Sequence, residues 1–77
     1  MNIFELQNRA CAKMEVQLEP WAEIYYLRKG DTIKFEHPAD EVGYYTVSVW
    51  GIDSMQVFPE GFLDYPAVFI NGQLAEP

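Results

Sequence analysis

The sequence predicts an α+β fold, in which one N-terminal helix packs on a small antiparallel sheet. Two observations carry this prediction. Apolar residues recur at helical spacing in the first quarter of the chain, and short runs of strand-forming residues separated by turn signals fill the rest. Together they indicate an amphipathic helix over about residues 2–18 and about five strands, arranged as a strongly bent sheet or a partly open barrel.

The helix prediction rests on a stripe of apolar residues that a helical wheel gathers on one face. These residues are Ile3, Leu6, Ala10, Met14 and Leu18. Glu5 and Arg9 lie on the opposite side at the i, i+4 spacing that stabilises a helix. Pro20 is expected to end the helix, because the residue before a proline is disfavoured in the α region.

Five later runs have the composition of strands. They cover residues 22–28, 32–37, 44–50, 55–58 and 67–70. The third run alternates strictly, so Tyr45, Val47 and Val49 share one face of the strand, and the register decides whether that face points inward. Asn71-Gly72 is typical of a two-residue hairpin turn, which predicts a short returning strand after the last run.

Residues 1–77 are expected to form a single domain, because the chain is too short for two hydrophobic cores. Cys11 is the only cysteine, which excludes an intramolecular disulfide and a cysteine-based zinc site. The composition, 49% hydrophobic and 16% aromatic, is typical of a globular protein. Apolar packing must therefore provide the stability, and we expect leftover apolar surface for a partner or for a homodimer.

The expected location is the cytoplasm. The N-terminal residues lack the basic and apolar regions of a secretory signal peptide, and a lone cysteine is common in reducing compartments. No apolar run approaches the roughly 18 residues of a membrane span, so no membrane partner is expected.

Charge is distributed unevenly along the chain, whose formal net charge is −7. All five basic residues lie within residues 1–34, where five acidic residues balance them. Residues 35–77 contain seven acidic residues and no Lys or Arg. Nucleic-acid backbones are recognised by clustered Lys and Arg, so direct nucleic-acid binding is not expected.

His37 is the one side chain that ordinarily titrates near neutral pH. Glu36 precedes it, but neighbouring residues of a strand point to opposite faces, and the chain has no second histidine. A metal or enzyme site centred on His37 is therefore the least favoured hypothesis. Cys11 is expected to be a buried, inert thiol. The glycines match no phosphate-binding pattern, and we predict no catalytic residue and no cofactor.

The aromatic residues provide the most specific indication of function. In the adjacent pairs Tyr25-Tyr26 and Tyr44-Tyr45, one ring must face away from the other. Tyr and Trp are favoured anchors of protein interfaces, although cross-strand packing within the sheet would also explain them. The candidate partner-binding residues are Trp50, Tyr44 and Tyr25 as anchors, with Asp40, Glu41, Asp53 and Asp64 as an acidic rim.

We therefore predict a non-enzymatic protein-interaction module that binds through an acidic and aromatic sheet face. A basic, nucleic-acid-binding protein fits such a face, and the module would then act as its inhibitor or decoy. Two alternatives stay open at this point. One is a small-ligand or sugar-binding domain that stacks its ligand on exposed Trp and Tyr. The other is that the carboxylates only maintain solubility.

Overall fold

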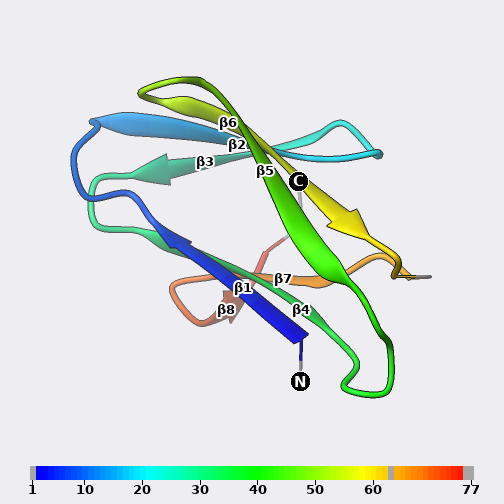
Figure 1. Ribbon diagram of the computed structural model, residues 1–77. Helices are drawn as coiled ribbons and strands as arrows, with labels where there is room; N and C mark the ends of the chain where they lie inside the picture. The colour runs from blue at the N-terminus through cyan, green and yellow to red at the C-terminus, as the bar shows by residue number, and fades with distance from the viewer. Residues whose placement is uncertain (1, 63, 76–77) are drawn as a thin grey trace.

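The structure, a computed structural model, describes residues 2–62 and 64–75, which form eight strands and no helix (Figure 1). One sheet, called sheet A here, has the strand order β1-β4-β7-β8 and is antiparallel throughout. Its strands are β1 (Asn2–Gln7), β4 (Thr32–His37), β7 (Ala67–Ile70) and β8 (Gln73–Leu74).

The other sheet, sheet B, has the strand order β3-β2-β6-β5. Its strands are β2 (Lys13–Leu18), β3 (Glu23–Arg28), β5 (Tyr44–Gly51) and β6 (Ser54–Glu60). Sheet B is mixed, because β2 and β6 run parallel whereas the other two pairs are antiparallel. The two sheets lie as two layers in Figure 1, and they do not close into a barrel.

The hydrophobic core lies between the two layers. Along β2, β3 and β4, buried residues alternate with more exposed ones, as expected for strands with one face on a core. Sheet A contributes Ile33, Phe35 and Val68, and sheet B contributes Met14, Val16, Leu18, Tyr25, Leu27, Met55 and Val57. Both layers therefore depend on each other for burial of their apolar faces.

The predicted helix over residues 2–18 is wrong, and with it the α+β class. That segment forms β1 and β2, joined by residues 8–12. The segment contains a period of two as well as a helical period, and in β2 Met14, Val16 and Leu18 are buried between outward polar residues. Pairing with β4, β3 and β6 satisfies the backbone of these strands, so long-range contacts override the local helical pattern.

The predicted strands are found, with ends that differ by up to two residues. Asn71 and Gly72 both have positive φ, as the predicted hairpin turn requires, and the short β8 follows them. The arrangement of the strands was predicted wrongly, because the chain forms two four-stranded sheets and not one bent antiparallel sheet or partly open barrel.

Asn8 organises the place where the chain crosses between the sheets. Its buried side chain donates from Nδ2 to the carbonyl oxygens of Cys11 and Leu27, both at 2.9 Å, and its Oδ1 accepts from the amide of Cys11 at 3.0 Å. Its backbone amide donates to the carbonyl of Asp31 at 2.9 Å, and its carbonyl accepts from the amide of Gly30 at 2.7 Å. The β1–β2 connection is thereby tied to the β3–β4 turn.

We expect Asn8→Ala to lower the free energy of unfolding by about 2–4 kcal/mol, because it leaves buried carbonyl and amide groups without partners. Chemical denaturation monitored by tryptophan fluorescence measures the change. Gln73→Ala, at an exposed position of β8, is the control and should change the value by less than about 0.5 kcal/mol. Equal stability of both variants would show that the Asn8 network is not a main determinant of the fold.

Candidate protein-interaction edge

β5 forms an open edge of sheet B, because β6 is the only strand paired with it in the described part of the chain. It is eight residues long and contains neither a charged residue nor a proline. Natural edge strands are commonly short or carry charges or prolines that block pairing with another chain. The one irregularity in β5 is a register shift between Val49 and Gly51, at its end.

The backbone of β5 presents hydrogen-bonding groups to this open edge. On the neighbouring strand, the carbonyl of Val57 accepts from the amide of Glu19 at 2.9 Å, so the polar backbone groups of Val57 point toward β2. Val57 is opposite Val47, and this antiparallel pair is therefore a non-hydrogen-bonded one. Since the two kinds of pair alternate, the N–H and C=O groups of Tyr45 and Val47 point away from β6.

Both faces of β5 expose apolar side chains. On the outer face, Tyr44 and Trp50 keep 65% and 71% of their surface exposed. On the inner face, Val47 is 40% and Val49 is 69% exposed, although they are paired with the buried Val57 and Met55. The second half of β5 therefore extends beyond the cover that sheet A provides for its neighbour β6.

Trp50 is held in place on the outer face by a short polar network. Its Nε1–H donates to Oε1 of Gln56 at 2.7 Å, and Nε2 of Gln56 donates to Oε2 of Glu19 at 2.7 Å. Gln17 donates to the same carboxylate oxygen at 3.0 Å. The indole ring is thus oriented before any partner binds, which lowers the entropic cost of using it as an anchor.

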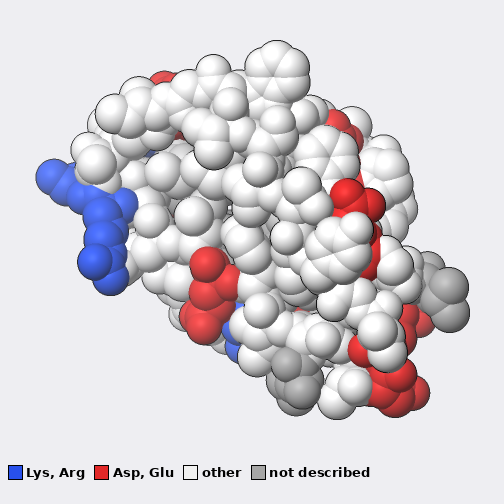
Figure 2. Space-filling model, in the orientation of Figure 1, with Lys and Arg blue, Asp and Glu red and all other residues white. Residues whose placement is uncertain are grey.

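Apolar exposure continues at both ends of β5. Val42 precedes the strand and Ile52 follows it, and both are largely exposed. In Figure 2, drawn in the orientation of Figure 1, the upper part of the face is largely uncharged, whereas acidic side chains gather at its lower right. Residues 42–52 therefore form an uncharged strip on the surface, and carboxylates lie beside it.

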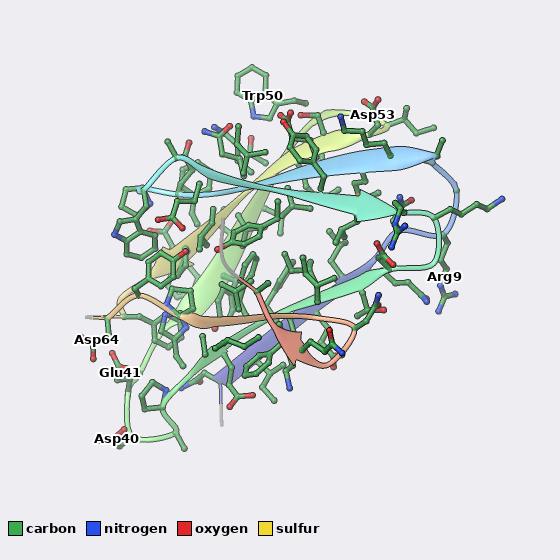
Figure 3. The ribbon with its side chains drawn as sticks, turned by 180° about the vertical axis from the view of Figure 1, so that it is seen from behind. Arg9, Asp40, Glu41, Trp50, Asp53 and Asp64 are labelled. Atoms are coloured by element: carbon green, nitrogen blue, oxygen red, sulfur yellow. The ribbon has the colours of Figure 1, made fainter. Side chains whose placement is uncertain are left out.

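The predicted acidic rim is divided between the two ends of β5. Figure 3 places Asp40, Glu41 and Asp64 together at one end of the molecule and Asp53 near Trp50 at another. Asp40 and Glu41 belong to the loop before β5, and Asp53 belongs to the turn that leads into β6. Within the described residues, Arg28–Asp31 and Lys34–Glu36 form ion pairs, and Asp40, Asp53 and Asp64 belong to neither of them.

Tyr25 does not lie on the surface where an anchor is needed. It is 3% exposed, packs against Phe35, and its hydroxyl lies 2.8 Å from that of Tyr65. Its neighbour Tyr26 is the outward member of this pair. In the other pair, Tyr44 faces outward and the Tyr45 hydroxyl turns inward to His37. Trp50 and Tyr44 are therefore the two predicted anchors that lie at the surface of β5.

His37 is a buried residue whose two ring nitrogens are both engaged. Nε2 donates to the carbonyl oxygen of Asp64 at 3.0 Å, because a carbonyl can only accept, and Nδ1 is hydrogen-bonded to the hydroxyl of Tyr45 at 2.6 Å. The ring stacks on Phe62 with 3.8 Å between centroids. This arrangement gives His37 a packing role and leaves neither nitrogen facing solvent.

Two tyrosines have raised pKa values. Burial raises the pKa of Tyr45 to about 12, and the carboxylates of Glu36 and Glu41 add to the rise. Burial, together with hydrogen bonds to Glu23 and Tyr25, raises the pKa of Tyr65 well above its ordinary value. The neutral phenols are thus favoured over the phenolates in the folded protein.

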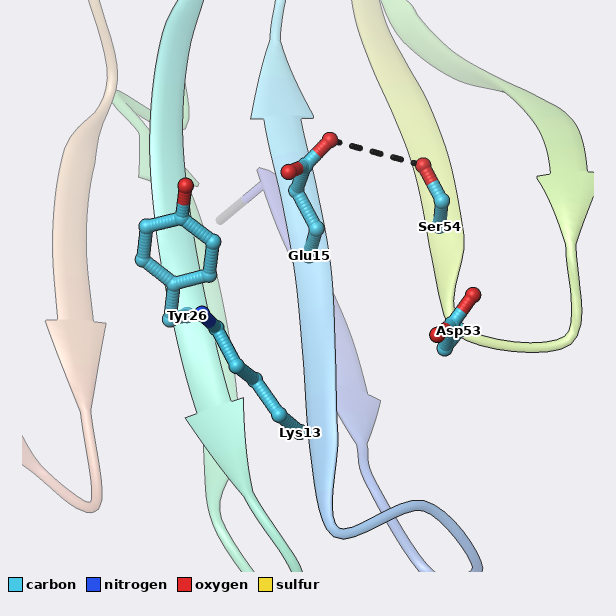
Figure 4. Close-up of a pocket in the computed structure, with 5 residues that line it drawn as sticks. All are labelled: Lys13, Glu15, Tyr26, Asp53 and Ser54. Atoms are coloured by element: carbon cyan, nitrogen blue, oxygen red, sulfur yellow. Dashed lines mark hydrogen bonds between the residues drawn. The ribbon is translucent and has the colours of Figure 1, made fainter.

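The outer face of sheet B also has a shallow depression of about 370 Å³ (Figure 4). It is lined by Lys13, Glu15, Tyr26, Asp53 and Ser54. The ammonium of Lys13 lies 4.3 Å from the centre of the Tyr26 ring, and Ser54 donates to Glu15 at 3.5 Å. The depression holds no buried polar group directed at a ligand, so we assign no ligand to it.

Among the described residues, no group of three or more His, Cys, Asp and Glu side chains is placed to hold a metal ion. The same residues form no helix long and apolar enough to cross a bilayer. No protein-family model, curated protein or solved structure matches the chain. The functional argument therefore depends on the geometry of β5 and its surroundings.

Sequence reasoning did not identify Val42, Val47, Val49 and Ile52 as surface residues. Alternation placed the two valines on one face of the strand without deciding which way that face points, and the structure shows that it is the inner face. Their exposure depends on where sheet A ends, and nothing in the local sequence reports that. The absence of charge over residues 44–51 was the available signal, because a long uncharged strand next to acidic turns is unusual for an edge.

Alkaline pH should destabilise the protein through Tyr45. Its raised pKa contributes stability that is present below pH 10, the ordinary tyrosine value, and is lost as the pH rises through about 12. We expect the free energy of unfolding to fall less steeply above pH 10 in Tyr45→Phe than in the wild type. Tyr44→Phe, which changes the exposed neighbour, should keep the wild-type slope. Identical slopes in all three proteins would show that the raised pKa of Tyr45 does not contribute to stability.

Proposed function

We propose that this protein is a non-enzymatic interaction module that binds a basic protein partner through β5. The observation that carries the proposal is the combination of a long, uncharged open edge with exposed apolar side chains on both of its faces. Such an edge promotes association with other chains, and natural proteins usually protect it. An unprotected edge in a chain this small is best explained by a partner that covers it.

The anchors have the chemistry of interface residues. Trp50 and Tyr44 expose large rings on the outer face, and Val47 and Val49 expose aliphatic groups on the other. Tyr and Trp dominate the binding energy of many interfaces because a large area is buried with few rotatable bonds. A partner that contacts both faces of β5 would bury all four side chains.

The charge of the chain favours a basic partner. The net charge is −7, and Asp40, Asp53 and Asp64 are exposed without an ion-pair partner in the described residues. Carboxylates around an apolar strip increase the rate of encounter with a cationic protein and repel anionic ones. A basic nucleic-acid-binding protein has this chemistry, and the module would then compete with nucleic acid for its surface.

A sugar-binding platform has less support. Trp21 lies in the turn after β2 and packs edge-on against Tyr65, with 4.8 Å between ring centroids. Trp50 lies at the other end of sheet B, next to the turn into β6. The two indoles therefore do not form one stacking surface for a small ligand.

Affinity capture from the source lysate, followed by measurement with the purified captured protein, tests the proposal. We expect the double variant Tyr44→Ser/Trp50→Ser to lose a basic protein that the wild type binds, with an affinity reduced by at least about tenfold. Added salt should also weaken the wild-type complex, because exposed charges are screened.

The matched control is Ile24→Ser/Tyr26→Ser, which removes two exposed apolar side chains from β3 at the opposite edge of sheet B. It should bind as the wild type does. If no basic protein distinguishes the β5 variant from this control, the proposed function is wrong.

A further inference from the structure

We infer that β5 binds its partner by strand addition, receiving an extended segment with alternating apolar residues at its centre and Lys or Arg at both ends. The inference rests on the proposed function and specifies how the partner is recognised. In strand addition the main chain of the ligand pairs with an open sheet edge, and alternate side chains and charges at the ends determine which ligand binds. The edge-directed backbone groups of Tyr45 and Val47 are the groups that such a segment would pair with.

β5 is distinct among the edge strands that the structure describes. β1 contains Glu5, β3 contains Glu23 and Arg28, and β8 has only two residues. A charged side chain or a very short strand discourages pairing with another chain. β5 alone combines length with the absence of charge, and eight residues extend about 26 Å at about 3.3 Å per residue.

The carboxylates at the two ends of β5 indicate the charge of the incoming segment. Asp40 and Asp64 lie beyond the start of the strand, and Asp53 lies beyond its end (Figure 3). A bound segment that spans the strand would therefore have both of its ends near acidic groups. Lys or Arg at these ends would form ion pairs, whereas Asp or Glu would be repelled.

A second copy of this chain fits the edge less well. Two copies of β5 paired antiparallel about Val47 would bring Asp53 of each copy toward Glu41 of the other, because both lie six residues from the centre. Each copy also has a net charge of −7. Like charges opposite each other destabilise a strand pair, so the basic segment is the favoured occupant.

The probe is a short synthetic peptide of alternating valine and threonine with two lysines at each end. Two control peptides separate the causes of binding. One has the same core with glutamates at the ends, and the other keeps the lysines but has two adjacent prolines at the centre of the core, so that one missing N–H faces β5 in either register. We expect fluorescence anisotropy to show binding of the first peptide at least about tenfold tighter than of either control.

The two matched protein variants differ in one backbone N–H group at the open edge. Val47→Pro removes an N–H that points away from β6, a position where an edge strand tolerates proline, and Val47→Thr keeps that N–H with a side chain of similar size. We expect Val47→Pro to weaken peptide binding by about tenfold or more and Val47→Thr to change it less than about threefold. Circular dichroism establishes that both variants are folded.

Intermolecular nuclear Overhauser effects between the peptide backbone and β5 of the wild type provide a test that needs no variant. Their presence at Tyr45 and Val47 supports strand addition. Binding of the lysine peptide or of the captured basic protein without these contacts, or with full affinity in Val47→Pro, overturns strand addition and leaves the proposed function standing. Dimers in ultracentrifugation that dissociate in Val47→Pro would overturn it in favour of a second copy.

Discussion

The hydrogen-bond network of Asn8 is the interaction on which the arrangement of the two sheets depends. The chain leaves sheet A at Asn8 to enter β2, and it re-enters sheet A through the turn before β4. Asn8 is bonded to both passages, to Cys11 in the β1–β2 connection, and to Leu27 at the end of β3 with Gly30 and Asp31 in the following turn. A buried amide whose groups are all satisfied favours one geometry, because alternatives would leave polar atoms buried without partners. With one cysteine the chain can form no internal disulfide, so non-covalent networks such as this one must hold the two sheets together.

The same arrangement explains why one strand is left uncovered. Sheet B begins at the Asn8 crossing with β2 and β3, and β6 joins the other side of β2 in parallel, which places β5 farthest from the crossing. Sheet A covers Met55 and Val57 on β6 but only part of β5, so Val47 and Val49 stay exposed. Part of the apolar surface that the composition indicated is therefore found on β5. Its position at an open edge connects the fold to the proposed binding of a partner.

The sequence alone was sufficient for local features and insufficient for long-range ones. Turn chemistry and alternation identified the hairpin at Asn71-Gly72 and the strands from β3 onward. The N-terminal helix was wrong because apolar residues in that segment fit two periods, and only pairing with distant strands selects between them. The parallel pair of β2 and β6 has no local signal at all. At the candidate site the sequence left the outward face of each strand open. Trp50 and Tyr44 lie at the surface of β5, whereas Tyr25 is buried because the register of β3 is determined by β2.

The central claim is that one side of β5 is paired with β6 and the other is open. Amide hydrogen exchange of the free protein, resolved by residue in NMR spectra, tests this claim most directly. The account predicts alternation along the strand, with slow exchange at Thr46 and Ser48, which face β6, and fast exchange at Tyr45 and Val47, which face the open edge. Equal and strong protection of all four amides in dilute solution would contradict it, because the edge would then be covered by the protein itself.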